Sequence, residues 1–292
     1  MATAKRATRR SPVTATPAAS RKLDEAVTHA LAAARQGDHA AALDRLIDAW
    51  AGAPSPELAV LISTASVLAR PTMTTVRGKT ASARQAWDAL AATHAPAGLP
   101  TLLESLADVS SGDGAQRLAT IATWRPDPRI DDAVVGLLET VPYRATSTKK
   151  FWIVLWPLVL AIRNRDLLAR LDAVSAAIEA NVAATMSEWL RAKLDAILPQ
   201  LRERFAQPAE PFTRRNAELI ADLATELGRA AGGDIRQRDL DHLLDAIYTT
   251  PEDDGPRLVY ADALLERGDP RGELIALQCR RELDRHQRAR QN

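Results

Sequence analysis

From residue 22 onward, apolar residues recur at the three- and four-residue spacing of one helix face, and this periodicity constrains the fold more than any other feature. The first such stripe consists of Leu23, Val27, Ala30, Leu31 and Ala34. Gly37 follows where a helix would end, and Asp38 is placed to cap the next one. The second stripe consists of Ala42, Leu43, Leu46, Ile47 and Trp50. The sequence therefore predicts two helices joined by a short turn.

The same signals recur along most of the chain. Ser55-Pro56 and Asp127-Pro128 each combine a capping side chain with a proline at the first helical position. Further helices are expected to begin near Thr80 and Pro100, and Gly112 and Gly114 are expected to break the chain between helices. Helical patterns continue over residues 166–180, 184–205 and 214–230. Short connectors favour antiparallel neighbours packed in series.

Composition excludes the main alternatives to a helical fold. Aromatic residues make up 4% and glycine contributes 13 of 292 residues, which is unlike a β-sandwich or barrel. The predicted fold class is all-α: irregular stacked helical hairpins resembling HEAT or tetratricopeptide repeats, with a small C-terminal helical module. Trp50, Trp87 and Trp124 are spaced by 37 residues, near the length of such a repeat, although the next position in phase is Ala161.

The net charge of +1 is unevenly distributed. Residues 1–22 carry six basic residues and no acidic one, and residues 280–290 carry a net +3, which leaves −8 on the rest. Residues 1–20 lack apolar periodicity and the apolar core of a secretory signal, so they are expected to be a disordered basic tail. Basic ends of this kind are either solvated or attract nucleic acid.

One strongly apolar run extends over residues 151–162 and contains Pro157. Twelve residues are too few to cross a bilayer as a helix, which takes about 20. We expect this run to be the most buried helix of the fold, kinked at Pro157. Docking on a membrane surface is the alternative interpretation.

The most distinctive stretch lies near the end of the chain. Asp254 is expected to cap a helix opened by Pro256, and Gly268 is placed to end that helix in the left-handed conformation. Asp269 and Pro270 are expected to begin the next helix. The apolar residues expected to face inward are Leu258, Val259, Ala261, Leu264, Leu265, Leu274, Ile275 and Leu277. The residues expected to form an ion-pair network at the corner are Arg257, Asp262, Glu266, Arg267, Arg271 and Glu273.

This stretch resembles the bacterial repeat-companion domain family (the 2996 companion domain), which is often found beside leucine-rich repeats. The resemblance covers about residues 238–282, and its matching residues include Asp253, Asp254, residues 256–262, Leu264, residues 266–275, Leu277 and Gln278. Ala263 departs from the family pattern, which usually has tryptophan there. The resemblance implies a small helical module without established catalytic residues. The signature residues expected to make its interactions are Asp253, Asp254, Arg257, Tyr260, Asp262, Glu266, Arg267, Asp269, Arg271 and Glu273.

Other motifs have simpler interpretations than catalysis. The carboxylates of Asp253, Asp254 and Asp262 are the kind of ligand that Mg²⁺ prefers, but helix capping and pairing to arginine are the more common uses. Arg267-Gly268-Asp269 spells an adhesion tripeptide, yet its glycine and aspartate also serve as a helix stop and a helix start. The single cysteine, Cys279, excludes a disulfide framework and a cysteine-based zinc site. No metal or cofactor is expected.

Gly232-Gly233 follows a helical pattern and is interpreted as a hinge, with the domain boundary at residues 231–236. The predicted domains are a disordered basic tail (1–20), an α-helical repeat-like domain (21–232) and the repeat-companion module (236–292). The sequence shows no nucleophile–base pair, which favours a non-enzymatic cytoplasmic scaffold that docks a protein partner. The alternatives are a nucleic-acid-binding helical protein that uses its basic ends, and a Mg²⁺-dependent hydrolase or phosphotransferase that uses the three carboxylates.

Overall fold

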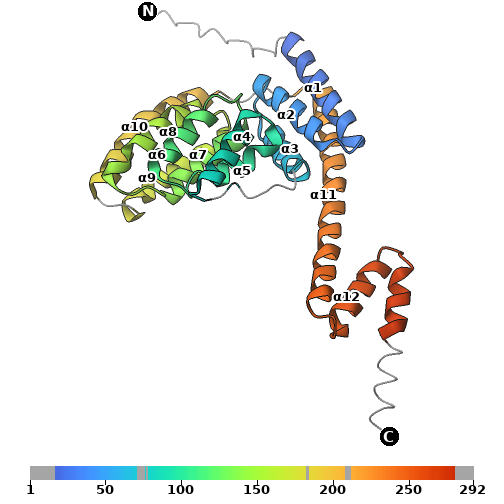
Figure 1. Cartoon of the computed structure of the whole chain (residues 1–292). Helices are drawn as coiled ribbons and strands as arrows, with labels where there is room; N and C mark the ends of the chain where they lie inside the picture. Colours follow the sequence, from blue (N-terminus) through green and yellow to red (C-terminus); the bar gives the residue numbers. More distant parts are fainter. Residues whose placement is uncertain (1–16, 71–75, 77, 182–183, 208–211, 280–292) are drawn as a thin grey trace, which may run out of the picture. The chain divides into compact units, whose positions relative to one another are not determined.

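The structure, a computed structural model, describes residues 17–70, 76, 78–181, 184–207 and 212–279. The described chain consists of helices and connecting turns and contains no strand, so the all-α helical-hairpin prediction is confirmed (Figure 1). The expected tail lies mostly outside the described residues, although α1 already begins at Pro17. The basic segment 280–290 lies outside them entirely.

The helices follow one another along the chain with short connections. They are α1 (Pro17–Arg35), α2 (His39–Gly52), α3 (Pro56–Leu68), α4 (Ala81–Ala92), η1 (Pro96–Gly98), α5 (Leu99–Glu104), α6 (Ser111–Ile121), α7 (Pro128–Thr140), η2 (Thr146–Thr148), α8 (Lys149–Ala161), η3 (Arg165–Leu167), α9 (Leu168–Asn181), α10 (Ala184–Phe205), α11 (Arg214–Thr249) and α12 (Asp254–Leu265). A further helix covers residues 271–279.

The predicted N-caps explain why several of these helices begin where they do. The side chains of Asp38, Ser55 and Thr80 accept hydrogen bonds from the backbone N–H groups of Ala41, Leu58 and Ala83. Gly37 adopts a φ of +76° after α1, which glycine reaches without steric cost. These signals are local in the sequence, so they could be predicted without tertiary information.

The predicted break at Gly112 and Gly114 is wrong, because both glycines lie inside α6. Gly114 is instead a packing residue. A Cβ atom at this position would lie 2.8 Å from the hydroxyl oxygen of Tyr143 and 3.1 Å from the carbonyl oxygen of Leu106. The position therefore requires glycine for the close approach of its neighbours rather than for a turn.

The chain divides into two compact units, Met1–Leu227 and Gly228–Asn292. The division falls a few residues before the predicted boundary at residues 231–236. The helix α11 continues through Gly232 and Gly233, so these glycines do not interrupt a helix. Each glycine costs a helix only about 1 kcal/mol relative to alanine, which a long helix tolerates.

Unit 1, residues 1–227, contains two hydrophobic clusters. The first is formed by α1, α2 and α3 together with Ile220, Leu223 and Leu227 of α11. Both predicted N-terminal stripes are buried in this cluster, as expected. Arg215 at the start of α11 also pairs with Asp24 of α1, with Nε and Oδ2 3.7 Å apart. The first helices are thus covered by a segment almost 200 residues later in the chain.

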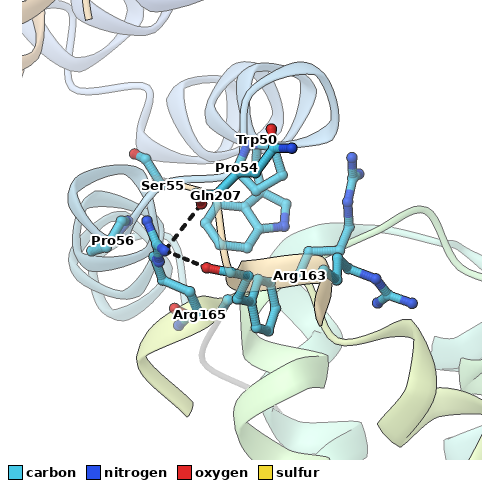
Figure 2. A pocket seen from close by; sticks show the side chains of 10 residues that line it. Trp50, Pro54, Ser55, Pro56, Arg163, Arg165 and Gln207 are labelled. Carbon is cyan, nitrogen blue, oxygen red and sulfur yellow. Dashed lines mark hydrogen bonds between the residues drawn. The ribbon is translucent and has the colours of Figure 1, made fainter. Parts of the chain in front are cut away.

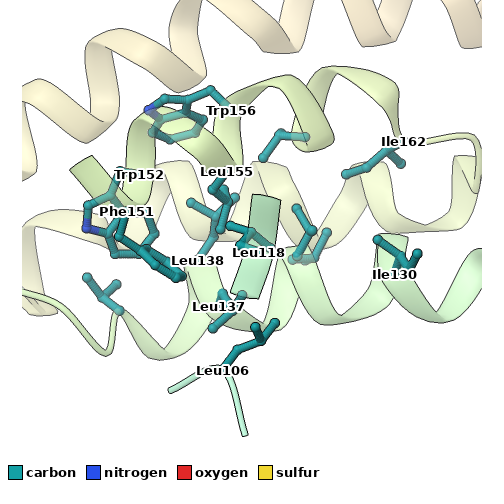
Figure 3. Packing of buried hydrophobic residues seen from close by; sticks show 14 of the residues in the cluster. Leu106, Leu118, Ile130, Leu137, Leu138, Phe151, Trp152, Leu155, Trp156 and Ile162 are labelled. Atoms are coloured by element: carbon teal, nitrogen blue, oxygen red, sulfur yellow. The ribbon is translucent and has the colours of Figure 1, made fainter. Parts of the chain in front are cut away.

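The second cluster is formed by residues from Val76 to Leu201, and α8 supplies three of its five buried aromatic side chains. Phe151, Trp152 and Leu155 lie on the side of α8 that faces Leu118 and the α7 leucines (Figure 3). The ring centroid of Trp156 lies 6.1 Å from that of Trp189 in α10. The apolar run at 151–162 is therefore the buried helix that its composition predicted. Among the described residues, no helix is long and apolar enough to cross a membrane.

A buried ion pair connects three elements of unit 1. The guanidinium of Arg129 lies 2.6 Å from Asp127 and also donates to the Ser66 hydroxyl of α3 and to the Pro96 carbonyl of η1. Asp127 at the same time caps α7 by accepting from the N–H of Arg129 at 2.9 Å. The sequence predicted this cap but gave no sign of its ion pair.

The three evenly spaced tryptophans occupy different environments. Trp50 and Trp87 are buried in α2 and α4, in separate clusters. Trp124 lies in the turn after α6, half-buried, with its ring centroid 5.2 Å from that of His94. Their spacing therefore does not mark equivalent positions of a repeat.

Candidate docking surface of the C-terminal unit

Unit 2, residues 228–292, contains a small hydrophobic core. Leu240, Tyr260 and Leu264 are its buried members, and Leu243, Leu244, Ile247, Ala263 and Ile275 pack against them. The helix at 271–279 approaches α12 closely at Gly272, where a Cβ atom would lie 2.5 Å from the carbonyl oxygen of Ala261. Glycine at this position therefore allows the two backbones to pack against each other.

The caps at the corner between these helices are those that the sequence predicted. Gly268 has a φ of +71°, and the N–H of Asp269 donates to the carbonyl of Leu264 at 3.0 Å, which is the pattern of a Schellman C-cap. The carboxylate of Asp269 then accepts from the N–H of Arg271 at 3.0 Å and so caps the next helix. The Arg-Gly-Asp sequence is accounted for by these two local roles.

The N-cap of α12 is Asp253, not Asp254 as predicted. Its carboxylate accepts from the N–H of Gly255 at 2.9 Å. Asp254 lies in the first turn and pairs with Arg257, whose Nη1 is 2.9 Å from Oδ1. Arg257 also donates to the carbonyl of Pro251. Both arrangements place a carboxylate at the positive end of the helix, and the backbone decides which of two adjacent aspartates is the cap.

The ion pairs of Arg257 and Arg271 are local rather than parts of a network joining the helices. Arg271 pairs with Asp269 at 2.6 Å, two residues away. The hydrogen bond from Arg271 lowers the pKa of the Asp269 carboxyl below its usual value. Among the other signature residues, Tyr260 is buried, whereas Asp262, Glu266, Arg267 and Glu273 are exposed.

The prediction of an inward apolar face is only partly correct. Ala261 and Leu264 are buried. The residues expected to be buried but found exposed are Leu258, Val259, Leu265, Leu274 and Leu277, with 37 to 57% of each side chain accessible. The correction has a simple geometric cause: unit 2 has few helices, and they cover only the stripe of α12 that contains Tyr260, Ala261 and Leu264.

We call the exposed apolar residues of unit 2 the docking surface. It consists of Tyr248, Leu258, Val259, Leu265, Leu274 and Leu277. Only three other large apolar side chains in the described part of the chain are exposed: Val60, Val67 and Ile153. Single exposed apolar residues are normal on a protein surface, but concentration on one small unit is typical of an interaction site.

The carboxylates considered for Mg²⁺ have other partners or lie apart. Asp253 caps α12 and Asp254 pairs with Arg257. Within the described ranges, no group of three or more histidine, cysteine, aspartate or glutamate residues is arranged to hold a metal ion. Cys279 is buried.

Comparison of the chain with protein-family models, curated proteins and solved structures finds no match. Function is therefore inferred from the residues themselves.

The sequence identified five of the six residues of the docking surface but assigned them to the core; Tyr248 was not among the residues expected to face inward. Their spacing is that of a buried helix face, and periodicity reports only that the residues share a face. Whether another helix covers that face depends on tertiary packing.

Proposed function

We propose that this protein is a non-enzymatic interaction scaffold whose C-terminal unit docks a protein partner. The observation that carries the proposal is the docking surface: six large apolar side chains exposed on a unit that buries only a small core. Burying an apolar side chain gains about 1.5–3 kcal/mol, so a partner that covers several of them binds favourably. The resemblance of residues 238–282 to the repeat-companion family, itself a proposal, supports a role without catalysis.

The polar signature residues support this surface rather than form it. Arg257, Asp253, Asp269 and Arg271 make the caps and ion pairs that hold α12 and the following helix. We therefore expect substitutions at these positions to act through folding, whereas substitutions at Leu274 and Leu277 act on partner binding. The single cysteine is in keeping with the reducing cytoplasm, where we propose that the scaffold acts.

The experiment captures partners from lysate of the source organism with the full chain, after nuclease treatment. The variant Leu274→Asp with Leu277→Asp changes two exposed residues of the docking surface. The matched control, Val60→Asp with Val67→Asp, changes two exposed residues of α3 in unit 1. We expect the first variant to lower the affinity for the captured partner by about tenfold or more and the control to leave it unchanged.

Circular dichroism of each variant verifies that its helices are intact. Equal capture by both double variants would refute docking through this surface. Loss of all capture after nuclease treatment, with nucleic acid eluting beforehand, would instead favour binding through the basic ends. That alternative also predicts a steep decrease in binding with salt.

A further inference from the structure

A pocket of about 230 Å³ lies where three segments of unit 1 meet. The segments are the connection between α2 and α3, the connection between α8 and η3, and the end of α10. We call it the arginine pocket; its basic residues are Arg163, Arg165 and Arg204. Its volume is below the roughly 300–1,000 Å³ of sites for drug-sized ligands, so its occupant is small or is one side chain of a larger molecule.

No carboxylate lines this pocket among the described residues, and their ion pairs include none of its three arginines. The charge of Arg163 interacts with the buried carboxyl group of Asp131, which accepts a hydrogen bond from the Arg163 backbone N–H. Arg163 donates to the carbonyl of Ala51 at 3.1 Å, and Arg165 donates to the carbonyls of Phe205 and Gln207. Arg204 donates to the carbonyls of Leu160 and Ile162. Backbone carbonyls are neutral groups, so these bonds orient the guanidinium groups without neutralising their charge.

Other cavities of unit 1 differ in this respect. Each combines arginine with acidic residues: Arg191 and Arg202 with Asp172 and Asp195, Arg170 with Glu139, and Arg84 and Arg117 with Asp88 and Asp113. The lining of the arginine pocket therefore has a surplus of positive charge that these three cavities lack. Each of its guanidinium groups uses one nitrogen in the bonds described, which leaves further N–H donors available.

The rest of the pocket lining combines apolar residues with the polar Ser55, Asn164 and Gln207. Pro54, Pro56 and Phe205 are half-buried along its walls, and Trp50, which exposes no surface, closes it. Figure 2 shows the Trp50 ring in the middle of the view, with Arg163 and Arg165 on opposite sides of it. Two polar side chains of the wall already accept hydrogen bonds: Ser55 from Leu58 and Asn164 from Asp166. The pocket thus offers an apolar centre with cationic donors around it.

We propose that the arginine pocket binds an acidic peptide segment, with one apolar side chain inserted against Pro54, Pro56 and Phe205 and flanking carboxylates paired with the three arginines. Arginine binds carboxylates through paired N–H donors and is enriched at the energetic centres of protein interfaces. The arginines surround the apolar centre, which matches a segment with acidic residues on both sides of one apolar residue. This site is separate from the docking surface and does not depend on it.

The test measures binding of a fluorescein-labelled peptide, Asp-Glu-Asp-Leu-Glu-Asp-Glu, to the full chain by fluorescence anisotropy. Two control peptides are used. In the amide peptide, every aspartate and glutamate is replaced by asparagine or glutamine, and in the serine peptide the leucine is replaced by serine. We expect the acidic peptide to bind and the amide peptide to bind at least about tenfold more weakly, because it loses every charge pair. The serine peptide should also bind more weakly than the acidic peptide. Added salt should lower the affinity of the acidic peptide.

Protein variants assign the binding to this pocket. Arg165→Gln and Arg204→Gln should each lower the affinity for the acidic peptide about fivefold, as expected for loss of one exposed ion pair. Arg202→Gln is the matched control for Arg204→Gln. Arg202 also lies on α10, but it pairs with Asp172 at another cavity. Gln207→Glu places a negative charge at the pocket and leaves every arginine in place, so it tests the charge argument even if an arginine variant fails to fold.

Equal binding of the acidic and amide peptides, or unchanged binding by Gln207→Glu, would overturn the proposal. Displacement of the peptide by inorganic phosphate, but not by chloride at the same ionic strength, would identify a site for small oxyanions and would also overturn it. The variant Leu274→Asp with Leu277→Asp should leave peptide binding unchanged. The failure of this proposal is therefore distinguishable from the failure of the docking surface.

Discussion

At the scale of single residues, the pKa of the Asp131 carboxyl group departs clearly from its usual value. It is 9% exposed and accepts backbone hydrogen bonds from Arg163 and Asn164 at 2.9 and 3.1 Å, both through Oδ2. Burial raises the pKa of Asp131 from 3.8 to about 6, and the two hydrogen bonds and the Arg163 charge oppose that increase only in part. This carboxylate orients the backbone that carries Arg163 and Asn164 into the arginine pocket.

The raised pKa predicts how stability depends on pH. Between about pH 4 and 6 the folded protein retains a proton on Asp131 that the unfolded chain releases, so this group makes stability fall as pH rises. Asp131→Asn keeps an oxygen that accepts both N–H groups but removes the titration. Relative to the wild type, the variant should gain up to about 3 kcal/mol between pH 4 and pH 7.5. Urea unfolding at both pH values measures the gain. The same difference in the free energy of unfolding between wild type and variant at pH 4 and pH 7.5 would contradict the prediction.

At the scale of elements, the packing of α6 against α8 depends on Gly114. The hydroxyl of Tyr143 lies 2.9 Å from the Leu106 carbonyl oxygen and 3.0 Å from that of Val109, and it occupies the space that a side chain at position 114 would need. Phe151 of α8 lies against the same position. Helix propensity favours alanine there, but the packing leaves no room for it.

Gly114→Ala is therefore expected to lower the free energy of unfolding by about 1–3 kcal/mol, the usual cost of overpacking. Gly136→Ala is the matched control, because Gly136 lies in α7 and a Cβ atom added there would have no heavy atom within 4 Å. The control should raise stability by up to about 1 kcal/mol through helix propensity alone. Thermal or urea unfolding of the two variants measures both changes, and a stabilising Gly114→Ala would refute the packing role.

At the scale of the whole molecule, the two units differ in how much core each contains. The two clusters of unit 1 include six buried aromatic residues, whereas the unit 2 cluster has three buried residues in all. Protection of amides from hydrogen exchange follows local burial. We therefore expect amides of α12 and residues 271–279 to exchange faster than those of α8.

Gly272→Ala tests whether unit 2 opens independently of unit 1. The added Cβ atom would collide with the Ala261 carbonyl and with Leu265, so exchange should accelerate in α12 and in residues 271–279. Exchange in α8 should not change. Gly233→Ala, which has open space around it in α11, is the control and should not accelerate exchange. Uniform acceleration across the chain, measured by mass spectrometry, would contradict the separate stability of the two units.

Local signals made most helix starts and stops predictable. Asp38, Ser55, Thr80, Asp127, Gly37 and Gly268 act within four residues of themselves, so their roles are present in the sequence. The buried helix at 151–162 was also predictable, because a run that apolar must be covered. Gly114 was misread because a glycine that permits close packing and one that breaks a helix look the same in sequence.

The candidate sites were less predictable. The docking surface has the spacing of a core, and its exposure depends on how few helices unit 2 contains. Arg163, Arg165 and Arg204 are ordinary surface residues in the sequence, and only the packing of α2, η3 and α10 places them around one pocket.

By itself, the sequence determined the helices, their caps and the faces that carry apolar residues, because these depend on interactions within a few residues. Tertiary structure alone decided that α11 covers α1–α3. It also decided which apolar faces remain exposed and which arginines gather at a pocket without a carboxylate in its lining. These outcomes depend on contacts between residues far apart in the chain. Helical periodicity records which side of a helix is apolar, but not what lies against it.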